Sequence, residues 1–399
     1  MQSCPRTLKI VMLTTVRFHL AKGGTEKVMI DTANALVDRG HEVTIIFRDK
    51  NGSSPGFTLN DNVKLVNCNL ADSPFWYSNF ACEVRAFSLS KSERAKKKAI
   101  LNLKSVAFRY REALTSCPAD VYITYDPKLS AMLVSEFHVQ QPIVTTFQFD
   151  PEHIIKRYYF EAVKSLIGRA GPIQVLLPHF KNRILSVIPG SQCVVIPNAV
   201  PQIEKKANLD TPLILNIGRV MPLKNQELIA RAMVVVHQKY PEWKAKIVGE
   251  ADVNNKYTLK IQKILSDNNL NNVVFFAGAS DNIADELLSS SIFVFPSISE
   301  GFGLALAEAM SAGLPCVGLK SCSAVSHLIQ HGKNGLLIEN TPESLADAII
   351  HLIKDNELRL RLGQQAKEDM KKFSPSQIWD QWENLLYALK NQNYQTSKS

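Results

Sequence analysis

The chain has no hydrophobic run long enough to cross a lipid bilayer. A spanning helix needs about 20 consecutive apolar residues, and no run among the 399 residues approaches that length. Near the amino terminus there is only a short apolar run, Ile10 to Leu13, which ends at Thr14, Thr15 and Arg17. We interpret this run as a buried first strand and not as a signal peptide.

The sequence also lacks the cysteine and carboxylate spacings that are typical of metal sites. The seven cysteines are scattered, and no pair has the spacing of a metal or redox motif. An Asp-x-Asp pair does not occur anywhere in the chain. We therefore expect reduced thiols in a cytoplasmic protein that binds no metal and no cofactor.

Composition and charge place the chain among ordinary globular proteins. Hydrophobic residues make up 45% of it and charged residues 21%, which is enough to build a sizeable core. This length favours two domains of about 200 residues each. The net charge of +9 bears on partners more than on fold. No nucleic-acid module is recognisable, so we expect no nucleic acid and favour an anionic membrane surface as a partner.

Short β-branched runs alternate with helical patterns from one end of the chain to the other. This alternation predicts parallel sheets flanked by helices, the α/β class. We place one domain at 1–200 and a second at 201–375, because polar residues after Pro201 interrupt the chain before a new set of strands begins. An apolar helix is predicted over 376–391. The predicted strands are 8–13, 43–47, 63–66, 121–124, 143–146, 175–177, 194–196, 213–217, 246–248, 273–276, 292–295, 316–318 and 336–338.

The most informative segment lies between Pro296 and Pro315. Glu300 and Glu308 stand eight residues apart, with glycines between them and an Ala-rich helical pattern after them. We expect Glu300 in the turn between a strand and this helix, and Glu308 just over one turn inside the helix. The start of a helix presents unpaired N–H groups and a positive dipole end, which suit a phosphate or a sugar oxygen.

A second segment, 215–226, supplies positive charge. It reads as a strand, a turn at Gly218, and then Arg219 and Lys224. Two cations suit a diphosphate and carboxylates suit sugar hydroxyls, so the two segments together indicate a nucleotide-sugar site. The ordinary alternative is a pair of solvated loop charges and a helix-capping Glu. A glycosidase carboxylate pair is a rival interpretation, but it would leave Arg219 and Lys224 without a role.

These two segments resemble the large retaining GT-B glycosyltransferase family, which is known for a Glu-x7-Glu motif. The resemblance continues at Lys22–Glu26, Val194–Val200 and Asn334–Leu337, in the same order and over nearly the whole chain. It implies two Rossmann-like parallel-sheet domains that face each other across a cleft. The first would be the acceptor-side domain, with the helix 376–391 crossing back onto it, and the second would bind the nucleotide sugar at the carboxyl ends of its strands.

The resemblance also implies a role for each candidate residue. Arg219 and Lys224 would stabilise charge on the leaving diphosphate, and Glu300 would lie beside the donor sugar, so we take these three residues as catalytic. Glu308 would hold the nucleotide ribose. The other donor-binding candidates are Gly23, Gly24, Gly218, Gly249, Glu250 and the backbone N–H groups of Phe302, Gly303 and Leu304.

Two segments depart from the family pattern, one around Gln148 and one at Ser326–Ile329, where similar relatives often show Asn-Glu-Leu-Ile. Many relatives carry a His where this chain has Gln148, and His153 lies five residues further on. Because an amide does not titrate, the resemblance carries no acid–base role to Gln148.

The function that the resemblance implies is retaining transfer of a sugar from a nucleotide-diphosphate donor to a saccharide or lipid-linked acceptor, in surface polysaccharide or glycoconjugate synthesis. UDP is the expected nucleotide and GDP remains open; the absence of Asp-x-Asp and the two cations predict transfer without a metal. Two alternatives stay open: a nucleotide-sugar epimerase of GT-B fold, and a non-catalytic binding subunit of a polysaccharide assembly complex. The intact set Arg219, Lys224, Glu300 and Glu308 argues against the latter.

A basic segment, 91–111, has no place in that site. It contains eight lysines and arginines, with Ile100, Leu103, Ala107, Tyr110 and Leu114 at helical spacing beside them. A solvated helix packed by its apolar face is one interpretation. The other is an interfacial basic surface at the inner face of a membrane, with help from 75–77 (Phe-Trp-Tyr).

Overall fold

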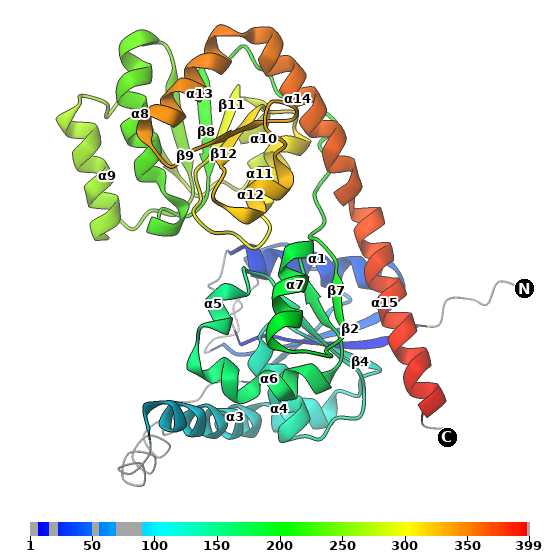
Figure 1. Ribbon diagram of the computed structural model, residues 1–399. Coiled ribbons are helices and arrows are strands. Elements are labelled where there is room, and N and C mark those ends of the chain that lie inside the picture. Colours follow the sequence, from blue (N-terminus) through cyan, green and yellow to red (C-terminus); the bar gives the residue numbers. More distant parts are fainter. Residues whose placement is uncertain (1–6, 16–22, 50–55, 69–89, 397–399) are drawn as a thin grey trace, which may run out of the picture. The chain divides into compact units, whose positions relative to one another are not determined.

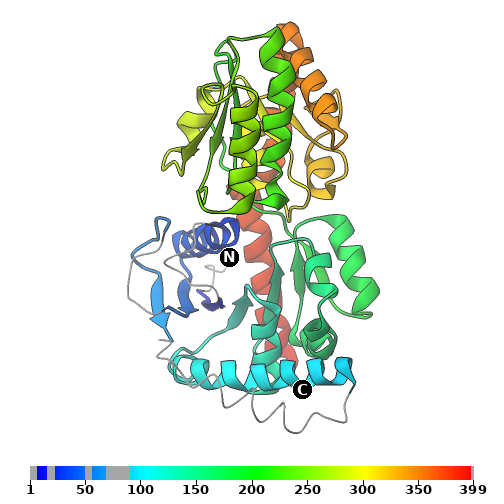
Figure 2. The same ribbon diagram turned by 90° about the vertical axis from the view of Figure 1, so that its left-hand side faces the viewer.

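The computed structural model describes residues 7–15, 23–49, 56–68 and 90–396 (Figures 1 and 2). The chain divides into two compact units. Unit 1 comprises Met1–Pro197 with Ile378–Ser399, and unit 2 comprises Asn198–Gln377. Segment 75–77 lies outside the described residues.

Unit 1 is built on a seven-stranded parallel sheet in the order β3-β2-β1-β4-β5-β6-β7. Its inner strands are nearly continuous runs of buried residues, as expected where helices cover both faces of a parallel sheet. The strands are β1 (Lys9–Leu13), β2 (Glu42–Phe47), β3 (Lys64–Asn67), β4 (Val121–Thr124), β5 (Ile143–Phe147), β6 (Ile173–Val175) and β7 (Cys193–Val195). The helices are α1 (Gly24–Asp38), α3 (Lys91–Ser116), α4 (Pro127–Ser135), α5 (Glu152–Ile155), α6 (Tyr158–Ala170) and α7 (Pro178–Val187).

The last helix, α15 (Pro375–Thr396), is tied to unit 1 by charged side chains from Ile378 onwards. Arg39 donates to Glu383 at 2.9 Å and lies 2.7 Å from Asp380. The buried His41 lies 3.1 Å from Glu383 through its Nε2 atom, and its Nδ1 atom accepts the Leu8 N–H at 3.3 Å. These contacts attach α15 to the turn between α1 and β2.

Unit 2 is built on a six-stranded parallel sheet in the order β10-β9-β8-β11-β12-β13. Helix α8 packs against α9 and α13, and α11 packs against α14. The strands are β8 (Leu213–Ile217), β9 (Lys244–Val248), β10 (Val274–Gly278), β11 (Ile292–Phe295), β12 (Cys316–Leu319) and β13 (Leu336–Ile338). The helices are η1 (Pro222–Lys224), α8 (Gln226–Lys239), α9 (Lys256–Asp267), α10 (Ile283–Leu288), α11 (Leu304–Ser311), α12 (Ser323–Leu328), α13 (Pro342–Lys354), α14 (Asn356–Met370) and η2 (Lys371–Phe373).

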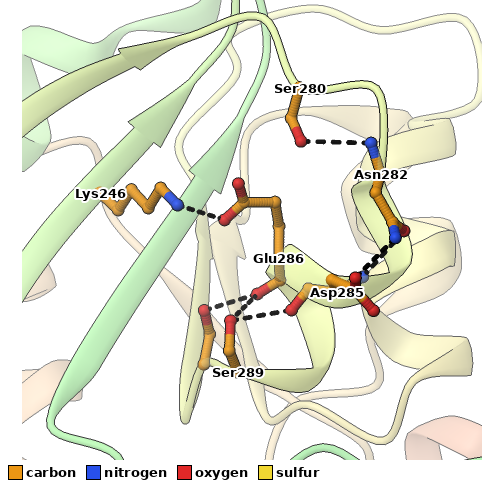
Figure 3. Close-up of polar contacts among 7 residues, drawn as sticks. Lys246, Ser280, Asn282, Asp285, Glu286 and Ser289 are labelled. Atoms are coloured by element: carbon orange, nitrogen blue, oxygen red, sulfur yellow. Dashed lines mark hydrogen bonds and ion pairs between the residues drawn. The ribbon is translucent and has the colours of Figure 1, made fainter.

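An ion pair holds the short helix α10 to the strand β9. Lys246 Nζ lies 2.5 Å from Glu286 Oε2, and both side chains are mostly buried (Figure 3). Asn282 caps the helix by accepting the Asp285 N–H at 3.2 Å. Neither residue belongs to the loops that follow β8 and β11.

All thirteen predicted strands are present, but the prediction for β6 is displaced. The strand covers Ile173–Val175 and not 175–177. Pro178 occupies the first turn of α7, with Leu177 as its N-cap. Because Pro has the backbone φ of a helix start and no N–H, the chain leaves the sheet before Leu177.

The part of the chain that the structure describes contains no helix that is both long enough and apolar enough to span a membrane. The described cysteines, Cys68, Cys117, Cys193, Cys316 and Cys322, are all free thiols. Burial raises the pKa of Cys68 and of Cys193 to about 11, so both are poor nucleophiles at neutral pH.

Candidate functional site

The two segments singled out in the sequence lie at the same edge of the unit 2 sheet. They follow β8 and β11, which are neighbouring parallel strands paired through Ile214 and Ile292. The Ile298 N–H donates to the Leu223 carbonyl at 2.9 Å and joins the two loops directly. Carboxyl ends of adjacent parallel strands are where open α/β sheets bind ligands.

Lys224 and Glu300 form an ion pair across these loops. Lys224 Nζ donates to Glu300 Oε1 at 2.6 Å, and the two side chains are 26% and 12% exposed. The ammonium also lies 5.7 Å from the Phe295 ring centroid. The structure thus brings together a cation and a carboxylate that are separated by 76 residues in the sequence.

Two glycines allow the strand ends to approach one another closely. A Cβ atom on Gly249 would lie 2.3 Å from the Gly218 carbonyl oxygen, and Gly249 has φ +147°. A Cβ on Gly218 would instead meet the Lys224 side chain at 3.7–3.8 Å. The turns after β8 and β9 therefore stack backbone to backbone, and the stem of Lys224 lies over the first of them.

The amide of Gln226 holds the loop after β8 in shape, a role that sequence reasoning missed. Gln226 is fully buried, and its Nε2 atom donates to the carbonyls of Arg219 at 3.0 Å and Gly218 at 3.4 Å. Its Oε1 atom accepts the Met221 N–H at 3.4 Å. A Gln in the first turn of a helix carries no pattern of its own, so only the fold reveals that it positions the loop bearing Arg219 and Lys224.

Helix α11 begins as the sequence predicted. Gly303 is its N-cap with φ +87°, a conformation that suits Gly, and Glu300 precedes it in the loop after β11. Glu308 lies half-buried just over one turn inside the helix. Phe302 is 2% exposed and packs edge-on against Phe373 at 5.2 Å, so its side chain anchors the loop. Gly303 and Leu304 place the first backbone N–H groups of the helix beside this anchor.

The remaining candidate residues are divided between the two units. Arg219 and Glu250 are exposed at the ends of β8 and β9, and the Glu250 carbonyl accepts the Val220 N–H at 2.9 Å. Gly23 and Gly24 belong to unit 1, where Gly23 is the N-cap of α1 and Gly24 is its first residue.

The segment after β5 in unit 1 contains Gln148 and His153. Gln148 Nε2 donates to Gln174 Oε1 at 3.3 Å, while its own Oε1 is buried without a hydrogen-bond partner. Gln174 donates in turn to the Ile196 carbonyl at 2.6 Å. His153 is exposed on α5.

No group of three or more His, Cys, Asp or Glu side chains that could hold a metal ion occurs within the described ranges. The charged candidates at this end of the sheet are Arg219 and Lys224 after β8, Glu300 after β11, and Glu308 inside α11.

Two family models together match almost the entire chain. Residues 22–202 match the model "Glycosyltransferase Family 4", and residues 201–369 match the model "Glycosyl transferases group 1". The chain belongs to the group 1 glycosyltransferases.

Several proteins are similar to this glycosyltransferase over more than nine tenths of its length. An uncharacterized glycosyltransferase of Haemophilus influenzae is 24% identical over 91% of this chain and 96% of its own length. The lipopolysaccharide core biosynthesis glycosyltransferase LpsE of Rhizobium meliloti is 24% identical over 94% of this chain and 99% of its own. A crystal structure of a Staphylococcus aureus TarM variant with Fondaparinux, alpha-GlcNAc-glycerol and UDP has a TM-score of 0.75 at 18% identity, covering 95% of this chain and 100% of TarM. The chain has the two-domain GT-B fold.

Proposed function

We propose that this glycosyltransferase transfers a sugar with retention of configuration from a UDP-sugar to a saccharide or lipid-linked acceptor in surface polysaccharide or glycoconjugate synthesis. The observation that carries the proposal is the Lys224–Glu300 pair at the carboxyl ends of β8 and β11. UDP in the TarM crystal structure and the lipopolysaccharide role in the name of LpsE support the donor and the product class.

In this proposal the charged side chains of unit 2 contact different parts of the donor. Arg219 and Lys224 contact the diphosphate and stabilise the negative charge that grows on it as the glycosidic bond breaks. Glu300 restrains the Lys224 ammonium and lies beside the donor sugar. Glu308 accepts hydrogen bonds from the ribose hydroxyls, and the N–H groups at the start of α11 face the donor oxygens.

Glu300 is the carboxylate beside the donor sugar in this proposal, and because Lys224 engages it we do not assign it as a nucleophile. We therefore propose attack of the acceptor on the same face of the sugar from which the diphosphate departs, assisted by a departing phosphate oxygen. The two cations take the place of a divalent metal, so the proposal requires neither metal nor cofactor. Gly218 and Gly249 keep the backbone close enough for Lys224 to reach the diphosphate.

A nucleotide panel tests the donor. We expect UDP and a UDP-sugar to raise the thermal unfolding midpoint by mass action, and GDP to raise it less. The same UDP-sugar should release free UDP in a transfer assay, and the anomeric configuration of the product, read by NMR, should match that of the donor. An isomerised donor without free UDP would support an epimerase instead, and stabilisation without either product would support a binding subunit.

A further inference from the structure

Helix α3 packs against unit 1 through a buried apolar face. Leu103, Ala107 and Tyr110 are buried on that face, where α3 packs against α4 and α6 (Figures 1 and 2). The Tyr110 hydroxyl donates to the Thr14 carbonyl at 2.7 Å. Other described side chains of α3 are exposed, so the interior of unit 1 accounts for only part of the helix surface.

The side of α3 that borders this buried face carries two apolar side chains that stay exposed. Phe108 is 77% exposed, the largest exposure of any large hydrophobic side chain in the described ranges, and Ile100 is 46% exposed. Ile100 therefore does not belong to the buried stripe in which the sequence had placed it. A single exposed apolar residue is ordinary, but a Phe and an Ile two turns apart on one helix face form a ridge.

Basic side chains flank this ridge. Lys97, Lys104 and Arg111 are exposed and lie three or four residues from Ile100 or Phe108, hence on the same side of the helix. Among the described side chains of α3, four basic residues (Arg94 and the three just named) and two acidic residues are exposed. One of the acidic residues, Glu93, is engaged by the Ser90 cap of the helix. The exposed face is thus amphipathic and positively charged.

We propose that this face of α3, defined by Lys97, Ile100, Lys104, Phe108 and Arg111, docks on an anionic lipid bilayer. Phe108 and Ile100 enter the boundary between headgroups and acyl chains, and the three basic side chains contact anionic headgroups. A soluble polyanion would be attracted by the charges but would gain nothing from the exposed Phe. Charge and apolar anchor together favour a lipid surface.

Vesicle binding of the full chain tests the proposal. The probes are vesicles of phosphatidylcholine alone and of equal parts phosphatidylcholine and phosphatidylglycerol. We expect binding to the anionic vesicles only, weakening as salt screens the charges. Each basic side chain near an anionic surface contributes about fivefold to partitioning, so reversing Lys97 and Lys104 to Glu together should weaken binding at least ~20-fold. Equal binding to neutral vesicles would overturn the proposal.

Two control variants separate this face from general charge and hydrophobicity. Lys239→Glu with Lys256→Glu makes the same charge change on exposed residues of unit 2, and Leu360→Ser removes an exposed apolar residue of α14. We expect both to bind anionic vesicles like the unmodified chain, while Phe108→Ser loses most binding. If Phe108→Ser bound as tightly as Leu360→Ser, the ridge would not be the anchor.

The same variants distinguish lipid from polyanion and from a folding defect. Phe108→Ser should bind immobilised heparin as tightly as the unmodified chain. Its thermal midpoint and its transfer to a soluble acceptor should be unchanged, because Phe108 is exposed and is none of the candidate site residues. A variant that lost heparin and vesicle binding together would indicate a polyanion surface, which contradicts the lipid assignment.

Discussion

Replacing Lys224 with Ala distinguishes its proposed catalytic role from a structural one, because the chain offers a matched control. Lys224 pairs with Glu300 at 2.6 Å, with side-chain exposures of 26% and 12%. Lys246 pairs with Glu286 at 2.5 Å, with exposures of 23% and 16%. Lys246→Ala therefore removes an equivalent ion pair from unit 2 (Figure 3), one that joins β9 to α10 and involves no residue of the loops after β8 and β11.

The expected losses follow from the burial of the partner carboxylates. Removing one partner of an exposed pair costs about 0–1 kcal/mol, and of a fully buried pair about 3–5 kcal/mol. We therefore expect each variant to lose roughly 1–3 kcal/mol of unfolding free energy. Only Lys224→Ala also removes a cation beside the departing diphosphate, which should lower kcat by about 10²–10³, or roughly 3–4 kcal/mol.

Denaturant unfolding measures the first quantity, and release of UDP from the accepted UDP-sugar measures the second. Similar stability losses with a rate loss confined to Lys224→Ala would agree with the proposed role. The reasoning is refuted if Lys246→Ala loses as much activity as Lys224→Ala, because the effect would then be structural. It is equally refuted if Lys224→Ala keeps its full kcat.

Three further predictions concern backbone approach, metal and pH. Gly249→Ala should lower transfer about 10²-fold, because its Cβ would lie 2.3 Å from the Gly218 carbonyl and displace that turn by about 1 Å; Gly332→Ala, with φ +74° and open space around its Cβ, should keep its activity. Transfer measured with EDTA should stay within about tenfold of the untreated rate, and a larger loss would show that the cations do not replace a metal. Burial alone would raise the pKa of Asp120, but hydrogen bonds from the Lys390 side chain and a backbone N–H lower it. The lowered pKa means that ionised Asp120 stabilises the folded state. This contribution is present above the unfolded-state pKa of about 4 and is lost as pH falls through the lower folded-state pKa. Unfolding titrations of Asp120→Asn across that range should therefore show a shallower decline than the unmodified chain, and an equal decline would contradict the assignment.

Local patterns predicted most of the fold. Strands 213–217, 292–295 and 336–338 match β8, β11 and β13, because each is a short β-branched or aliphatic run between clear turn residues. The run ending at Leu177 misled the prediction for β6, since apolar character continues past the sheet into the cap of α7. Periodicity shows that a run is buried, but not where its backbone leaves the sheet.

The candidate site was predictable in its parts but not in its contacts. The turn at Gly218 and the start of α11 at Gly303 could be predicted because each is a local feature. The pairing of Lys224 with Glu300 could not, since it depends on β8 and β11 being neighbours in the sheet. Gln226 was missed for the same reason, because a buried amide that binds its own loop leaves no spacing pattern in the sequence.

Calorimetric titration of UDP into the unmodified chain and Glu308→Gln tests the central claim most directly, namely that unit 2 holds a uridine nucleotide at the start of α11. Glu286→Gln serves as a control for the loss of one carboxylate charge from the same unit. Hydrogen bonds to a charged group contribute roughly 1.5–3 kcal/mol, so Glu308→Gln should bind UDP about 10–100-fold more weakly while Glu286→Gln binds it normally. UDP affinity that is unchanged in Glu308→Gln, or no UDP binding by the unmodified chain, would contradict the account.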